Sequence, residues 1–204
     1  MTDPDVLRFV TGALPAPPAR VLEVGAGDGS LAATLRESGY EVVAIDPAGG
    51  PAVEQVHLHE LDEPDGSFDA AVAVLSLHHV EPLPESLDRL AALLPSGARV
   101  VVDEFDIACF DERAAAWWAD QRELACGEPQ ENPMALVRTM RDHLHSAAAL
   151  RSGLQRSGFA LGPVERGPYL YRWHLPPGLR GAEEQLIAVD KLPRTGVRFL
   201  AVRS

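Results

Sequence analysis

The chain has 204 residues, of which 46% are hydrophobic and 24% charged, and this fits one soluble α/β domain with a modest extension. Its formal net charge of −12 disfavours a binder of nucleic acid or anionic lipid, because such proteins usually carry a basic surface. No apolar run reaches the ~18 residues of a membrane span. The N-terminus lacks the pattern of a signal peptide, so we expect a cytoplasmic protein.

The first half of the chain alternates short apolar runs with helical patterns, which predicts βαβ units. Helices are expected at residues 3–14, Ser30–Ser38 and Leu83–Leu94. Strands are expected at Arg20–Val24, Glu41–Ile45, Gln55–Leu58, Phe68–Leu75 and Arg99–Glu104. The run at Phe68–Leu75 is continuously apolar, as a buried parallel strand requires.

The second half changes character after residue 105 and is mainly helical. Helices are expected at Asp111–Cys126, Ala135–Arg141, Ser146–Ser157 and Ala182–Asp190, with a polar loop at Gly127–Pro133. Strands are expected at Tyr169–His174 and Gly196–Arg203, where they complete the far edge of the sheet. The pattern therefore predicts an α/β fold with a Rossmann-like doubly wound sheet. This sheet is mostly parallel with an antiparallel last strand, and a small helical cap accompanies it.

A glycine-rich loop from Glu23 to Gly29 joins the first strand to the next helix. Glycine has no Cβ, so the backbone can turn sharply and a ligand can lie against it. The helix that follows presents unpaired N–H groups, which would suit a dinucleotide phosphate equally well. Two features argue against a dinucleotide: the spacing is G-x-G-x-G, with Ser30 where G-x-G-x-x-G has its last glycine, and Glu23 precedes the turn. A carboxylate there would repel a pyrophosphate but hold a cationic ligand.

The stretch Glu23-Val24-Gly25-Ala26-Gly27-Asp28-Gly29 resembles the first motif of class I S-adenosylmethionine (SAM)-dependent methyltransferases. The likeness is to the type 11-like small-molecule methyltransferases. In that family the loop packs around the methionine portion of SAM, which carries an ammonium and a sulfonium group. The resemblance implies SAM as the cofactor and S-adenosylhomocysteine as its product.

Two further motifs agree with this family in order and spacing. Asp46 ends the second strand, 21 residues after Gly25, where the family uses an acid to hold the ribose hydroxyls. The third motif places an acid near the adenine, here Glu60 or Asp62, and a strand that ends at Leu75 and Ser76 beside the cofactor. The implied cofactor residues are Glu23, Gly25, Ala26, Gly27, Gly29, Asp46, Pro47, Glu60, Leu61, Asp62, Leu75, Ser76 and His79.

The resemblance also implies how the chain is organised. Residues 1–204 form a single methyltransferase domain, in which residues 1–105 are the SAM-binding core. Residues 106–168 are a helical substrate-recognition insert, and residues 169–204 supply strands at the sheet edge.

Methyl transfer mainly requires that the nucleophile, methyl group and sulfur are aligned and that water is excluded. A general base is needed where the acceptor is a hydroxyl or protonated amine. His143 and His145 precede a helix, and we hypothesise that one of them is this base. His78 follows a strand at the ligand-binding edge and is a third candidate, although such histidines also cap or pack. Glu104 can approach the acceptor or be structural. No metal is expected, since neither the histidines nor the two cysteines have metal-ligand spacing.

Aromatic side chains in the second half are candidates for contact with a flat acceptor. Trp117, Trp118, Tyr169 and Tyr171 are predicted to bind substrate, and alternation along a strand would put Tyr169, Tyr171 and Trp173 on one face. Packing in the core of the cap is the alternative interpretation.

The sequence thus favours a SAM-dependent methyltransferase that acts on O, N or C of a small metabolite. The chain has no Asn/Asp-Pro-Pro-Tyr/Phe after the Phe68–Leu75 strand and no Pro-Cys nucleophile pair, which disfavours nucleic-acid substrates. A non-catalytic SAM-binding or partner-binding protein of the same fold remains an alternative. An NAD-dependent oxidoreductase is disfavoured by the glycine spacing and by Glu23. The sequence does not indicate an oligomeric state.

Overall fold

The computed structural model of the chain describes residues 3–127, 132–176 and 178–204. Residues 128–131 of the predicted polar loop Gly127–Pro133 lie outside the described part. The chain divides into two compact units. The first comprises residues up to 104, 148–164 and 198–204, and the second comprises residues 105–147 and 165–197.

A mixed β-sheet is built from seven strands in the described residues, in the order β2-β1-β3-β4-β7-β5, with β6 paired to β7. The strands are β1 Arg20–Val24, β2 Glu41–Ile45, β3 Ala70–Val74, β4 Arg99–Phe105, β5 Phe159–Leu161, β6 Glu165–Gly167 and β7 Gly196–Arg203. Strands β2, β1, β3 and β4 are parallel, whereas β7 runs antiparallel to β5. The predicted doubly wound sheet with an antiparallel last strand is therefore confirmed.

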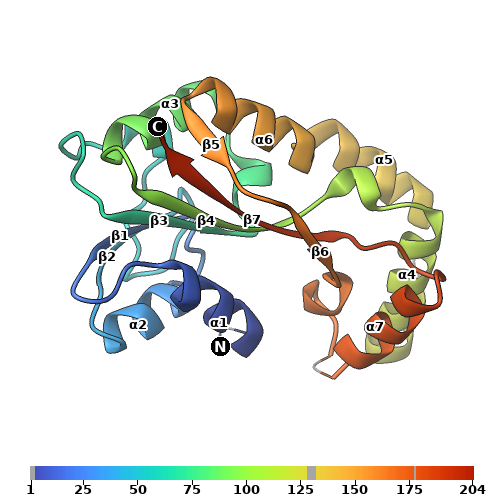
Figure 1. Ribbon diagram of the computed structural model, residues 1–204. Coiled ribbons are helices and arrows are strands. Elements are labelled where there is room, and N and C mark those ends of the chain that lie inside the picture. Colours follow the sequence, from blue (N-terminus) through green and yellow to red (C-terminus); the bar gives the residue numbers. More distant parts are fainter. Residues whose placement is uncertain (1–2, 128–131, 177) are drawn as a thin grey trace. The chain divides into compact units, whose positions relative to one another are not determined.

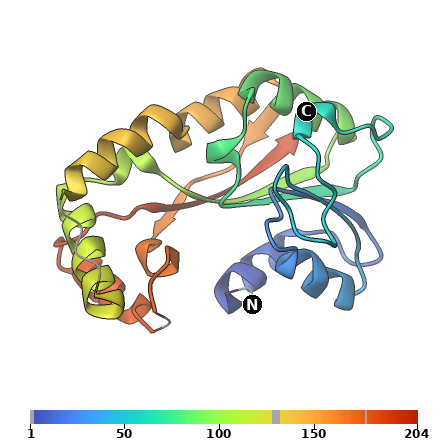
Figure 2. The ribbon, with the colours of Figure 1, turned by 180° about the vertical axis from the view of Figure 1, so that it is seen from behind.

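Helices cover both faces of the sheet in the first unit. Helices α1 (Pro4–Ala13) and α2 (Ser30–Glu37) lie on one face (Figure 1). Helices α3 (Leu83–Leu93) and α6 (Ala147–Arg156) lie on the other, and Figure 2 shows the same two layers from behind. The sequence sets these boundaries locally. For example, the Asp3 carboxylate accepts a hydrogen bond from the Asp5 amide at 2.8 Å, and Pro4 starts α1 where no amide is needed.

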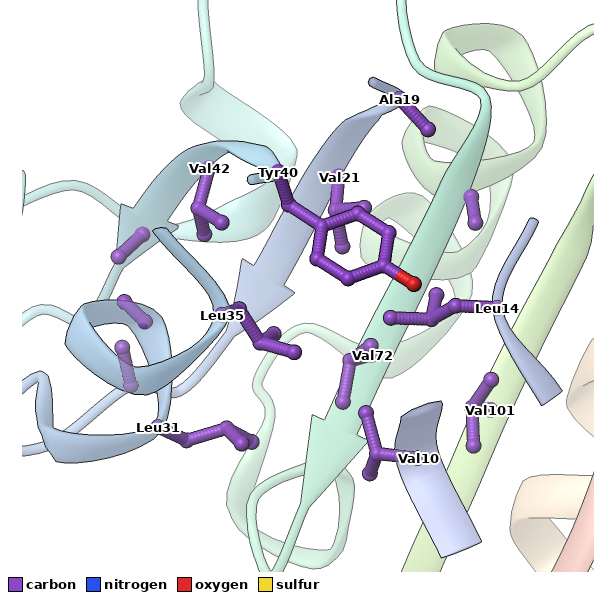
Figure 3. Close-up of a cluster of buried hydrophobic side chains, with 14 of the residues drawn as sticks. Val10, Leu14, Ala19, Val21, Leu31, Leu35, Tyr40, Val42, Val72 and Val101 are labelled. Atoms are coloured by element: carbon purple, nitrogen blue, oxygen red, sulfur yellow. The ribbon is translucent and has the colours of Figure 1, made fainter. Parts of the chain in front are cut away.

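The core between the sheet and helices α1 and α2 is formed by aliphatic side chains and one tyrosine (Figure 3). It contains Val10 and Leu14 of the α1 segment, Leu31 and Leu35 of α2, Val21, Val42, Val72 and Val101 of the strands, and Tyr40. The Tyr40 hydroxyl donates a hydrogen bond to the Pro15 carbonyl at 3.0 Å, so this polar group is satisfied although the side chain is buried. This packing fixes the strands whose carboxyl ends carry the candidate site.

The second unit contains α4 (Glu112–Cys126), α5 (Pro133–His143) and α7 (Arg180–Ala188) around an aromatic core. The rings of Trp118 and Trp173 are stacked with centroids 4.1 Å apart, and Phe105 and Tyr169 are stacked at 4.7 Å. The Trp118 indole N–H donates to the Trp173 carbonyl at 2.9 Å. Trp118 and Tyr169, predicted to bind substrate, are therefore buried packing groups in this unit.

The prediction of a strand at Gln55–Leu58 is wrong. An isolated parallel bridge joins Glu54 to Ile45, and the chain then leaves the sheet and forms a 3-10 turn, η1 (Leu58–Glu60). The bridge uses the Glu54 amide, which donates to Ala44, and the Glu54 carbonyl, which accepts from Asp46. The Val56 amide donates back to the Glu54 carbonyl at 3.0 Å instead of to β2, so the chain leaves the sheet at this point.

The prediction of a strand at Tyr169–His174 is also wrong. The backbone amides of Tyr169, Leu170 and Tyr171 donate to the carboxylate of Glu183 instead of to a neighbouring strand. This buried acid of α7 stabilises a 3-10 turn, η4 (Leu170–Arg172), so the three aromatic side chains do not share a strand face.

Two three-residue strands were not predicted. Both β5 and β6 are too short to show the alternation of polar and apolar residues that predicts a strand. They form by backbone pairing with β7. Strand β7 has the predicted range, but it lies between β4 and β5 and not at the edge of the sheet.

Candidate functional site

A cavity of about 320 Å³ opens at the carboxyl ends of β1, β2 and β3 in the first unit. This is the edge at which parallel α/β sheets bind ligands, and the volume lies within the range of small-molecule sites. Its walls are formed by Val24, Gly25, Ile45, Asp46, Pro47, Val56, His57, Leu58, Leu75, Ser76, His79, Val80 and Glu81.

The first two glycines of the loop between β1 and α2 have different surroundings. Gly25 and Gly27 both have positive φ angles, +68° and +54°, which glycine adopts without strain. A Cβ at Gly25 would lie 2.2 Å from the Cβ of Ser76, so Gly25 is needed for contact between two protein segments. A Cβ at Gly27 would meet nothing within 4 Å, so this position faces open space where a ligand can approach.

Asp46 links the glycine loop to the end of β2. One carboxylate oxygen accepts from the Gly27 amide at 3.0 Å, and the other accepts from the Ala48 amide at 2.8 Å. Each oxygen keeps a further lone pair, and the side chain lines the cavity. Asp46 therefore both fixes the loop and presents acceptor oxygens to a ligand.

Glu23 is a buried carboxylate at the end of β1, 4% exposed. Burial raises its pKa to about 7, although the charge of Arg36 and a hydrogen bond from the Ala32 amide act in the opposite direction. Its Oε2 atom has no hydrogen-bond partner among the described residues. A buried, unsatisfied oxygen of this kind is costly unless something pairs with it.

The segment after β3 forms a further wall. Leu75 has a φ of +55°, unusual for leucine, and the buried Ser76 has a hydroxyl without a partner in the described part of the chain. His78 is 5% exposed, and its Nδ1 lies 2.5 Å from Glu104 Oε2. His78 is therefore held inside the protein and does not line the cavity, whereas the exposed His79 does.

The structure brings six of the predicted cofactor residues together in the cavity wall: Gly25, Asp46, Pro47, Leu75, Ser76 and His79. Glu23, Ala26, Gly27 and Gly29 belong to the adjoining loop or its supporting strand and are not part of the wall. The prediction missed Val24, Ile45, Val56, His57, Leu58, Val80 and Glu81. A signal for three of these was present in the sequence, because Val56, His57 and Leu58 lie in the stretch Gln55–Leu58 that is predicted as a strand next to this edge.

Glu60, Leu61 and Asp62 are not brought to the cavity. The turn η1 directs Glu60 and Asp62 to the surface, and Leu61 is buried. The side chain of Arg89 accounts for this path, since it donates to the carbonyl oxygens of Leu61 and Glu63. The wall at this point is formed by His57 and Leu58 and carries neither of the predicted acids.

The remaining predicted residues belong to the second unit. His143 is the last residue of α5 and is exposed, and the half-buried His145 lies in the link to α6. Trp117 and Tyr171 are half-buried. Their predicted roles toward an acceptor stay predictions.

Comparison with known proteins agrees with this geometry. The sequence profile of a methyltransferase domain family matches residues 4–162, which is most of the chain. The chain belongs to this methyltransferase domain family.

The similar proteins include a demethylmenaquinone methyltransferase of Clavibacter sepedonicus, 37% identical over 114 residues that cover 48% of this chain and 46% of that protein. A SAM-dependent methyltransferase structure from Mesorhizobium loti superposes with a TM-score of 0.62 at 19% identity, covering 98% of this chain and 96% of that one. A second structure is the 1,6-didemethyltoxoflavin-N1-methyltransferase of Burkholderia thailandensis with S-adenosylhomocysteine bound. Its TM-score is 0.56 at 20% identity, with 98% of this chain and 76% of that one covered. This methyltransferase domain spans about half the length of the curated relatives it matches.

The residues of this methyltransferase domain fit SAM on two observations. The unpaired buried oxygen of Glu23 suits a cationic group, and the open space at Gly27 leaves room beside the loop. A pyrophosphate would instead be repelled by Glu23 once this side chain is ionised, above about pH 7. These two features therefore suit a cationic nucleoside better than a dinucleotide.

Titration of Glu23 should lower the stability of the methyltransferase domain as pH rises from about 5 to 7. Its pKa is about 7 when folded against an ordinary 4.5, so in this window the folded state keeps a proton that the unfolded state has released. Raising the pH therefore removes stability, by up to about 3 kcal/mol, and the loss levels off above pH 7. Urea unfolding of the wild type and Glu23→Gln at pH 5 and 7 measures this change.

The variant Glu23→Gln cannot titrate, so its free energy of unfolding should change less between the two pH values. Glu37→Gln, at an exposed glutamate of α2, serves as the control and should behave as the wild type. Parallel pH profiles for the wild type and Glu23→Gln would contradict the assignment.

Removal of the Asp46 carboxylate should weaken cofactor binding. We expect Asp46→Ala to lose about 1–3 kcal/mol of binding free energy for S-adenosylhomocysteine, the range for a charge-assisted hydrogen bond. Asp69→Ala is a matched control, because Asp69 also accepts a backbone amide, that of Arg20 at 2.7 Å, but precedes β3 at the opposite end of the strands. Calorimetric titration should find Asp69→Ala within about twofold of the wild type, and equal losses in both variants would refute a specific role for Asp46.

Proposed function

We propose that this chain is a SAM-dependent methyltransferase that transfers a methyl group to O, N or C of a small molecule. The observation that carries the proposal is the buried Glu23 carboxylate, with one unpaired oxygen, at the base of a G-x-G-x-G loop. This arrangement favours a cation over a pyrophosphate. Family membership and the positions of Gly27 and Asp46 support the same conclusion.

The residues that would hold the cofactor lie at the ends of β1 and β2 and in the segments that follow β2 and β3. Glu23 would pair with its ammonium group, directly or through water, and Asp46 would accept hydrogen bonds from the ribose hydroxyls. The apolar side chains of Val56, Leu58 and Val80 would contact the flat base. When bound, SAM supplies an activated methyl group on a sulfonium.

The contribution of the chain to the reaction is then alignment and exclusion of water. A general base is needed where the acceptor carries a proton, and His143 and His145 remain our candidates for it. His78 is not proposed for this role, because its Nδ1 is engaged by Glu104 and its side chain is buried.

A small metabolite is the proposed acceptor. Demethylmenaquinone and 1,6-didemethyltoxoflavin, named for two of the similar proteins, are both small molecules. The net charge of −12 disfavours nucleic acid as the substrate. Among the described residues, no helix combines the length and the apolar composition needed to cross a membrane. We further propose a cytoplasmic location.

Calorimetric titration of the purified protein with SAM, S-adenosylhomocysteine and NAD tests the proposed cofactor. We expect both sulfur nucleosides to bind and NAD not to bind. Binding of NAD without SAM would overturn the proposal. Transfer of a tritiated methyl group from SAM to candidate metabolites then tests catalysis, and cofactor binding without transfer to any acceptor would favour a non-catalytic SAM-binding protein.

A further inference from the structure

Glu104 is a fully buried carboxylate in β4, and the hydrogen bonds it accepts come from one short segment. Its Oε1 accepts from the backbone amides of Ser76 and Leu77 at 2.9 and 2.6 Å. Its Oε2 lies 2.5 Å from Nδ1 of His78. Both carboxylate oxygens are therefore used, and their partners are three consecutive residues.

This segment is the wall of the cavity after β3. Leu75, Ser76 and His79 line the cavity, and the backbone turns through a left-handed conformation at Leu75 as it leaves the strand. Such a conformation is unfavourable for leucine and persists only where the surroundings impose it. Gly25 packs closely against the side chain of Ser76, because even a single added methyl group there would overlap it. Ser76 is thus held through its amide by Glu104 and packed at its side chain against Gly25.

The burial of Glu104 excludes direct contact with an acceptor. Its side chain is 0% exposed, and it is not among the residues that line the cavity. Its two oxygens are instead engaged by two backbone amides and one imidazole of a single segment.

We propose that Glu104 is a positioning residue for the cofactor, which holds the Leu75–His79 segment in the shape that binds SAM. This inference rests on the proposed function, since it assigns the cavity to the cofactor. Glu104 acts through the backbone amides of Ser76 and Leu77 and through His78. A carboxylate suits this role better than an amide, because both of its oxygens accept, whereas glutamine has only one acceptor oxygen.

The test compares Glu104 with its neighbour Asp103. Asp103 is also buried, but as the adjacent residue of β4 it points to the other face of the sheet, where it accepts from Arg198 Nε at 2.6 Å. Asp103→Ala therefore removes a buried carboxylate from the same strand without disturbing the side-chain contacts of Ser76 and Leu77. We expect both Glu104→Ala and Asp103→Ala to unfold at a lower temperature than the wild type.

The affinity for S-adenosylhomocysteine separates the two variants, and a merely structural role would not do so. At a temperature where all variants are folded, Glu104→Ala should bind at least about tenfold more weakly than the wild type, as expected when several hydrogen bonds that fix a binding wall are lost. Asp103→Ala should stay within about twofold. Glu104→Gln keeps one acceptor oxygen and should recover part of the affinity.

Each outcome has a defined meaning. If the wild type does not bind S-adenosylhomocysteine, the proposed function fails. If the wild type binds and Glu104→Ala binds as well as Asp103→Ala, the positioning role is refuted while the function stands. If Glu104→Ala does not fold, Glu104→Gln is compared with Asp103→Asn. Weaker binding by Glu104→Gln, by about threefold or more, supports the role, and equal binding refutes it.

Discussion

Replacement of Gly25 by alanine should be among the most destabilising single changes in this protein. The added Cβ would lie 2.2 Å from the Cβ of Ser76, and the φ of +68° is unfavourable for any residue with a side chain. A left-handed conformation costs roughly 1–2 kcal/mol, and overpacking adds about 1–3 kcal/mol. Urea denaturation should therefore give a free energy of unfolding lower by about 2–5 kcal/mol than that of the wild type.

Gly66 provides the control for backbone strain. Its φ of +67° is almost the same, but an added Cβ there meets nothing within 4 Å. Gly66→Ala should thus show the conformational cost alone, and its difference from Gly25→Ala measures the contact with Ser76. Equal losses in the two variants would mean that Ser76 moves aside easily and that the two loops are not tightly packed.

Replacement of Gly27 by valine should abolish cofactor binding while leaving a folded protein. The position faces open space, so the protein itself does not oppose the side chain apart from the strain at a φ of +54°. The valine would instead occupy the space beside the loop into which we place the cofactor. We expect the affinity for S-adenosylhomocysteine to fall by about 100-fold or more, as measured by calorimetry. The reason is that the valine side chain and the cofactor would overlap in the same space.

Gly66→Val separates this effect from backbone strain. Gly66 lies in the turn before β3, at the end of the strands opposite to the cavity, and valine there carries a similar conformational cost. It should lower stability to a comparable degree and leave the affinity unchanged. If Gly27→Val also binds S-adenosylhomocysteine normally, the cofactor does not lie against this part of the loop.

These two glycines divide the glycine loop into parts with different tasks. Gly25 packs the loop against the segment after β3, whose backbone amides donate to Glu104, and Gly27 keeps the ligand side open. The shape of the cavity therefore depends on residues from β1, β3 and β4 together. A change in any of the three segments should therefore alter cofactor binding.

The sequence alone was enough to predict the βαβ units, the glycine loop and the position of Asp46. These features are local: apolar periodicity defines the strands and helices, and the positive φ angles at Gly25, Gly27 and Gly29 favour glycine. The position of Asp46 follows from the parallel sheet, because a residue that ends β2 must lie at the same edge as the loop that ends β1.

Only the tertiary structure decided which distant groups complete the site. Glu104 lies 28 residues from Ser76, and nothing in either local pattern indicates that the carboxylate accepts the Ser76 amide. In the same way Arg89 directs Glu60 and Asp62 away from the cavity, and Glu183 turns the Tyr169–Tyr171 backbone out of the predicted strand. In each case a buried or half-buried charged side chain satisfies backbone groups far away in sequence. A local pattern shows that a backbone group needs a partner, but the folded chain determines which partner reaches it.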